Sequence, residues 1–90
     1  MVMTSYEFEV AAKNAVVDLI DGATVQDLQL VWFTHTLGNK KCCIWAPIMG
    51  TKYAEVTYSV GKDVIWVDVY EKVYHGEIFS DKFNFEVKSL

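Results

Sequence analysis

Hydrophobic residues recur at intervals of three and four near the start of the chain. This spacing predicts a helix over about Ser5 to Ile20. Thr4 and Glu7 have the spacing of a capping box at its start, and Asp21-Gly22 supplies a stop. The predicted buried positions of the helix are Phe8, Ala11, Ala12, Ala15, Val16, Leu19 and Ile20.

The stretch from Leu28 to Ala46 has the composition of a β-hairpin folded at Gly38-Asn39. This loop predicts strands over Leu28–Thr36 and Lys40–Ala46. It would place Leu37 opposite Lys40, Phe33 opposite Ile44, and Trp32 opposite Trp45. One face would carry Val31, Phe33, His35, Cys42, Ile44 and Ala46, and the other Leu30, Trp32, Thr34, Thr36, Lys41, Cys43 and Trp45. Because neither face is polar, both are expected to be covered or to bind something.

A second hairpin is predicted from Tyr53–Val60 and Asp63–Tyr70, folded at Gly61-Lys62. A single turn over Thr24–Asp27 precedes the first hairpin, and Pro47–Thr51 forms a loop between the two hairpins. In the second hairpin, the predicted inner pairs are Tyr58–Ile65, Val56–Val67 and Ala54–Val69, and the outer pairs are Thr57–Trp66, Glu55–Asp68 and Tyr53–Tyr70.

The tail shows a further strand pattern over Lys82 to Val87, where Phe83, Phe85 and Val87 alternate with polar residues. This strand would extend the sheet, cover its outer face, or pair with a second copy of the chain. The predicted fold is therefore α+β: one N-terminal helix packed on an antiparallel meander of four to five strands. We expect a single domain over residues 1–90, with a flexible start at 1–4 and a tail at 73–90. The helix would cover Val31, Phe33, Ile44, Val56, Tyr58, Ile65, Val67 and Val69.

The composition excludes several classes of function. The net charge is −4, and every basic residue is Lys. Nucleic-acid binding is therefore not expected, because it needs clustered Lys and Arg. We also expect neither a signal peptide nor a membrane-spanning segment. The adjacent Cys42 and Cys43 would point to opposite faces of a strand, so they should not form a disulfide, as in a reduced cytosolic protein.

The outer face of the sheet would gather all three tryptophans, and an aromatic patch of this size is typical of an interface. Three interpretations stay open: the tail covers this face, the face forms a homodimer, or it binds a partner or ligand. The residues that we expect to form a partner-binding surface are Trp32, Trp45, Tyr53, Glu55, Thr57, Trp66, Asp68 and Tyr70.

Candidate catalytic and metal-binding groups are few. Glu55 opposite Asp68 would place like charges together, with Lys41 or Lys72 as the counter-charge. No nucleophile accompanies these carboxylates, so we expect no catalytic residues. His35 would face Cys42, but two such residues do not complete a metal site, and we expect neither metal nor cofactor. A buried thiol beside a hydrogen-bonded histidine is the favoured interpretation.

Several short motifs together resemble a family of small proteins of unassigned function, encoded by phages and prophages of Gram-positive bacteria. The resemblance covers roughly Phe8 to Lys72. The tail from Val73 onward lies outside it, and Cys42, Cys43 and Trp45 depart from it. The motifs are Val31-Trp32, Thr36-Leu37-x-Asn39-x-Lys41, Tyr53-x-Glu55-Val56-Thr57-Tyr58 and Asp68-x-Tyr70-x-Lys72.

This resemblance implies a phage protein that acts in the cytoplasm of the host bacterium. By analogy with small acidic phage proteins, we expect a non-catalytic accessory protein that binds and inhibits a bacterial host protein. An anti-defence factor of the CRISPR-inhibitor kind is the specific expectation. Two alternatives stay open. One is a sponge for a small ligand or nucleotide, held by Thr34, Thr57 and Lys41, and the other is a self-assembling structural component of the phage.

Overall fold

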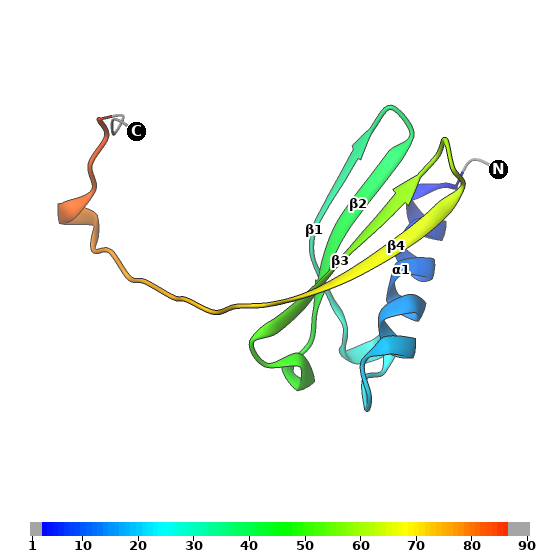
Figure 1. The fold of residues 1–90 in the computed structure, drawn as a ribbon, viewed down its shortest axis with the longest axis horizontal. Coiled ribbons are helices and arrows are strands. Elements are labelled where there is room, and N and C mark those ends of the chain that lie inside the picture. Colours follow the sequence, from blue (N-terminus) through cyan, green and yellow to red (C-terminus); the bar gives the residue numbers. More distant parts are fainter. Residues whose placement is uncertain (1–2, 87–90) are drawn as a thin grey trace.

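A computed structural model describes residues 3–86 and shows a helix packed on a four-stranded antiparallel sheet (Figure 1). Helix α1 spans Ser5–Leu19, and the strands are β1 (Gln29–Thr36), β2 (Asn39–Trp45), β3 (Lys52–Ser59) and β4 (Val64–Glu71). The strands lie in chain order across the sheet. Short 3-10 helices η1 (Val25–Asp27), η2 (Pro47–Met49) and η3 (Ser80–Lys82) occupy the connections and the tail. The predicted α+β meander is confirmed.

Helix α1 begins at the predicted capping box. The Glu7 backbone N–H donates to Thr4 Oγ1 at 3.1 Å, and the Thr4 N–H donates to Glu7 Oε1 at 2.9 Å. These two bonds satisfy amides that the first helical turn leaves without partners. The helix then buries Phe8, Ala12 and Val16 against the sheet.

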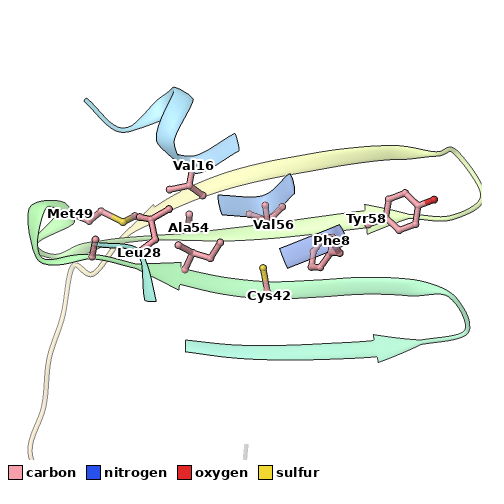
Figure 2. Close-up of a cluster of buried hydrophobic side chains, with 11 residues drawn as sticks. Phe8, Val16, Leu28, Cys42, Met49, Ala54, Val56 and Tyr58 are labelled. Atoms are coloured by element: carbon pink, nitrogen blue, oxygen red, sulfur yellow. The ribbon is translucent and has the colours of Figure 1, made fainter. Parts of the chain in front are cut away.

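The core lies between α1 and the two central strands (Figure 2). β2 contributes Cys42 and Ile44, and β3 contributes Ala54, Val56 and Tyr58, all of them buried. Other predicted inner residues are less buried, because the edge strands reach beyond the single helix. Ile65 and Val67 are partly buried, whereas Phe33 and Val69 are 37% and 43% exposed.

The second hairpin has the predicted register at every pair, from Tyr53 opposite Tyr70 to Tyr58 opposite Ile65. Its loop is longer than the predicted two residues, because the last ladder pair is Ser59 with Val64. Asp63 adopts φ 53°, and its Oδ1 accepts a 2.9 Å hydrogen bond from Tyr58 Oη. This bond ties the loop to the core.

The predicted register of the first hairpin is wrong by two residues. The turn is formed by Leu37 and Gly38, with φ values of 53° and 86°, as a type I′ turn requires. Thr36 therefore lies opposite Asn39, and Phe33 opposite Cys42 rather than Ile44. The side chain of Asn39 accepts a 3.0 Å hydrogen bond from the Val60 N–H, which joins the two hairpins.

A bulge in β1 changes the faces predicted for two further residues, Leu30 and Val31. Leu30 lies opposite Ile44 and Trp32 opposite Cys43, so Val31 is the extra residue. Leu30 consequently packs against the core, although it was predicted on the outer face. Val31 was predicted inside and is 56% exposed.

The predicted fifth strand over Lys82 to Val87 is not formed in the part of the tail that the structure describes. Residues 72–79 are extended without strand pairing, η3 follows, and residues 83–86 are again irregular. Val87 lies outside the described residues. This segment, which we call the arm (residues 72–86), leaves β4 and runs away from the sheet (Figure 1).

Candidate functional site: an aromatic groove on the outer sheet face

A groove of about 480 Å³ lies on the sheet face opposite α1, at the end where β2 meets β3. Its aromatic walls come from three different strands. Trp32 stands on β1, Trp45 on the last residue of β2, and Tyr53 near the start of β3. We call this feature the outer groove. The residues that line it and carry the argument below are Val31, Trp32, Cys43, Trp45, Lys52, Tyr53, Glu55 and Lys72.

The position of Trp45 is fixed by the loop that follows β2. Its indole Nε1–H donates to the Gly50 carbonyl at 2.9 Å. Pro47 begins η2, Met49 is buried in the core, and Gly50 reverses the chain with φ 60°. Met49 therefore anchors the loop in the core, and the loop holds the Trp45 ring as a preformed wall of the groove.

The floor of the outer groove lies on a row of paired residues that crosses the sheet. Trp32 pairs with Cys43 and Cys43 with Glu55, and the row continues outside the groove to Asp68. Cys43 is only 6% exposed beneath the aromatic rings. Burial, and next the charge of Glu55, raise the pKa of its thiol. Cys43 is therefore a poor nucleophile at neutral pH, since the thiolate is the reactive form.

Lys41 supplies the counter-charge expected for the carboxylates. Its Nζ lies 3.1 Å from Glu55 Oε1. The hydrogen bond and charge of Glu55 raise the pKa of Lys41. Because both side chains are partly exposed, at 41% and 22%, the pair contributes under about 1 kcal/mol to stability. Its main effect is to neutralise the one carboxylate in the groove wall.

The structure brings four of the eight predicted surface residues into the outer groove: Trp32, Trp45, Tyr53 and Glu55. The other four lie on the same face without lining the groove. Tyr70 stacks on Tyr53 with ring centroids 5.4 Å apart, and Lys62 Nζ lies 5.5 Å from the Trp66 ring centroid. Thr57 and Asp68 complete this second group, opposite Trp66 and Glu55 respectively.

The arm does not close a second core over this face. Its large apolar side chains are themselves exposed, including Val73 at 92% and Phe85 at 91%. Trp32 and Trp66 are 41% and 45% exposed. Within residues 3–86, the outer face therefore stays open.

The predicted pairing of His35 with Cys42 is wrong, because the corrected register places His35 opposite Lys40. The prediction that the two cysteines face opposite ways is confirmed: Cys42 lies in the core and Cys43 in the groove floor. Burial raises the pKa of Cys42 to about 11. Within residues 3–86, no three His, Cys, Asp or Glu side chains gather as metal ligands.

Sequence reasoning missed Lys52 and the bulged Val31 as groove residues, and it named Lys72 only as a possible counter-charge for Glu55 and Asp68. Lys52 precedes the strand that was predicted from Tyr53, and Lys72 follows β4. The Lys72 N–H donates to the Thr51 carbonyl at 2.9 Å, which brings both lysines to one end of the groove. The sequence did hold a sign of this: Lys52 and Lys72 flank the two ends of the second predicted hairpin, which an antiparallel pair of strands brings together.

None of the helices in the part of the chain that the structure describes has the length and apolar character needed to cross a membrane. Comparison with known families matches residues 4–79 to a family of unknown function, DUF6275. The match extends beyond Lys72 into the arm, so the first part of the arm lies within the family pattern, contrary to our expectation. Neither the curated proteins nor the solved structures contain a match to this chain.

Proposed function

We propose that this chain, which belongs to the DUF6275 family, is a non-catalytic protein whose outer groove binds a segment of a bacterial host protein. The observation that carries the proposal is the preformed aromatic groove on a sheet face that no other element covers among the described residues. Interface energies concentrate where Trp and Tyr line such pockets. The inner face has no comparable role, because α1 seals its centre.

The charges around the groove indicate what kind of segment would bind. Glu55 is neutralised by Lys41, whereas Lys52 and Lys72 form no ion pair within the described residues. A partner side chain that enters between Trp32 and Trp45 should therefore be apolar or aromatic. A carboxylate next to it would meet the two lysines. We infer a recognition segment in which an apolar anchor is flanked by Asp or Glu.

The finer proposal is a phage accessory protein that acts in the host cytoplasm against a defence component such as a CRISPR effector. Its support is the family-like motif set given above together with the acidic charge of the chain. The buried, weakly acidic thiol of Cys43 and the lysine-neutralised Glu55 favour binding over catalysis.

The test compares two tryptophans of matched exposure on the same face. Trp32→Ala removes a groove wall, whereas Trp66→Ala removes an aromatic ring outside the groove. Tagged wild-type protein and both variants are used to capture partners from lysate of a Gram-positive host. We expect one protein to be lost with Trp32→Ala and retained with Trp66→Ala. Equal recovery by all three proteins would contradict the groove assignment.

A plaque assay tests the finer proposal separately. The protein is expressed in a bacterium that carries an active CRISPR system, and the cells are challenged with a phage which that system targets. We expect plaque numbers to rise by at least tenfold with the wild type and Trp66→Ala, but not with Trp32→Ala. Unchanged plaque numbers with the wild type would contradict inhibition of that system while leaving the groove proposal to the capture experiment.

A nucleotide-like ligand is the second candidate, favoured by the volume of the groove and its mixture of tryptophans with two lysines. A base would stack on Trp32 or Trp45, and its phosphates would meet Lys52 and Lys72. Thr34, Thr57 and Lys41, the polar groups first expected to hold a ligand, do not line the groove. Native mass spectrometry with mono- and cyclic dinucleotides tests this candidate. A nucleotide-binding groove should give a protein peak with the added mass of the nucleotide, and Lys72→Ala should reduce the fraction of protein in that peak.

A further inference from the structure

Strand β1 forms one edge of the sheet, and apart from the bulge at Val31 it carries few of the features that protect an edge. The residues Gln29–Thr36 include no charged side chain and no proline. The opposite edge strand, β4, carries Asp68 and Glu71. An uncharged edge presents a row of free N–H and C=O groups that readily accept another strand.

The inner side of β1 also has an open notch. Helix α1 packs mainly on β2, β3 and β4 (Figure 1), and it reaches β1 through Phe8. A cavity of about 300 Å³ remains there, lined by Tyr6 and Glu9 of the helix and by Leu30 and Phe33 of β1. The Phe33 ring contacts Phe8 with centroids 6.0 Å apart, yet Phe33 stays 37% exposed. A fifth strand beside β1 would direct its inward side chains into this notch.

The arm has the complementary features. The Phe83 and Phe85 rings contact each other with centroids 6.4 Å apart, and in the sequence these residues alternate with Lys82, Asn84 and Glu86. This is a strand pattern that finds no partner strand within the described chain. Both phenylalanines are exposed, at 54% and 91%. Apolar surface of this kind in a single copy is typical of an interface.

We propose that the arm of one copy adds to the β1 edge of a second copy. Residues 82–86 would pair with β1, and Phe83 and Phe85 would fill the notch beside Leu30 and Phe33. The exchange is reciprocal, since each copy has one arm and one free edge, and it gives a twofold dimer. Nine residues lie between Lys72 and Lys82, so a fully extended arm would span about 33 Å over the ten steps from one to the other. The outer groove stays open, because the notch lies on the opposite face.

The mass of the full-length protein in solution tests this proposal. Light scattering coupled to size exclusion should give a dimer for the wild type and a monomer for Phe85→Asp. Val73→Asp is the matched control, because Val73 is equally exposed on the arm but lies outside the proposed strand. On the receiving side, Tyr6→Glu should abolish the dimer, whereas Leu19→Glu at the far end of α1 should retain it.

Amide hydrogen exchange gives a second readout, and its first part needs only the wild type. In the wild type, residues 83–86 and the outward-facing amides of β1 should exchange slowly, and they should lose this protection together in Phe85→Asp. A monomeric wild type would overturn the proposal. This holds also for a monomer in which residues 83–86 are protected because the arm pairs with β1 of its own copy. A dimer that survives both Phe85→Asp and Tyr6→Glu would also overturn it, because another surface would then hold the dimer.

Discussion

Both faces of the sheet carry large apolar or aromatic residues, but one face is buried and the other is exposed. The inner face carries Ile44, Val56 and Tyr58, which α1 covers almost completely. The outer face carries Trp32, Trp45 and Trp66, which no element covers among residues 3–86. Aromatic content alone therefore does not decide what becomes core. The difference arises because the chain supplies one helix, and one helix of fifteen residues covers the centre of one face.

Truncation of one residue on each face measures the difference directly. Ile44 is fully buried between α1 and the sheet, so Ile44→Ala should lower the free energy of unfolding by about 2–5 kcal/mol. Trp66→Ala on the outer face should cost about 1 kcal/mol or less, because the ring is 45% exposed. Urea denaturation of both variants checks this. Equal losses would mean that the outer face is also a structural core.

The pH dependence of stability should report the inner face. Burial raises the pKa of Cys42 from an ordinary value of 9.0 to about 11. Between these values the unfolded chain loses a proton that the folded chain keeps, so the unfolding free energy falls as the pH rises. The loss should be on the order of 2 kcal/mol between pH 9 and pH 11. Below pH 9 the thiol is protonated in both the folded and the unfolded chain, so this loss of stability does not occur.

Cys42→Val is the matched variant, since valine keeps a similar apolar volume without a titrating group. Its stability should fall less between pH 9 and pH 11 than that of the wild type. Raised pKa values of Cys43 and Tyr58 leave a residual slope in both proteins. If the unfolding free energies of the two proteins fall equally between pH 9 and pH 11, the pKa of the Cys42 thiol is not raised in the folded protein.

The wall of the outer groove should be sensitive to one hydrogen bond. Trp45→Phe removes the donor to the Gly50 carbonyl but keeps an aromatic ring. We expect a loss of about 1 kcal/mol in stability and faster amide exchange in residues 47–51. Trp32→Phe is the control on the facing wall. Unchanged exchange in the loop would show that Trp45 does not hold the groove in shape.

The smallest expected effect is a gain in stability at the first hairpin turn. Leu37 is 91% exposed and adopts φ 53°, which costs a branched side chain strain. Leu37→Asn should raise the unfolding free energy by about 0.5–1 kcal/mol, because Asn favours this conformation in type I′ turns. A thermal unfolding curve checks it. A loss of stability would mean that the Leu37 side chain makes contacts that matter.

The two hairpins show what the sequence could predict. In the second, Ala54, Val56 and Tyr58 alternate with Tyr53, Glu55 and Thr57, so only one register buries the apolar set, and that register was predicted correctly. In the first, both faces are apolar, so the pattern does not distinguish registers. The bulge at Val31 and the turn at Leu37-Gly38 depend on tertiary contacts such as that of Asn39 with Val60.

The aromatic face itself was predicted from strand alternation, but the outer groove was not. Its shape depends on the Trp45 to Gly50 hydrogen bond and on the meeting of Lys52 and Lys72 at one end. These contacts join residues from loops and strand ends, where alternation carries no information. The buried thiol of Cys43 was predicted on the correct face, although its raised pKa follows only from the rings and carboxylate around it.

A site-specific photo-crosslink tests the central claim most directly. Thr51 is exposed at the rim of the outer groove, and Leu37 is exposed at the distant first turn. A p-benzoylphenylalanine residue placed at each position in turn would be irradiated in living Gram-positive host cells. We predict one crosslinked host protein from position 51 and none from position 37, with the position-51 product lost when Trp32→Ala is added. A product of the same mass from both positions, or one that persists with Trp32→Ala, would contradict the claim that the outer groove is the binding site.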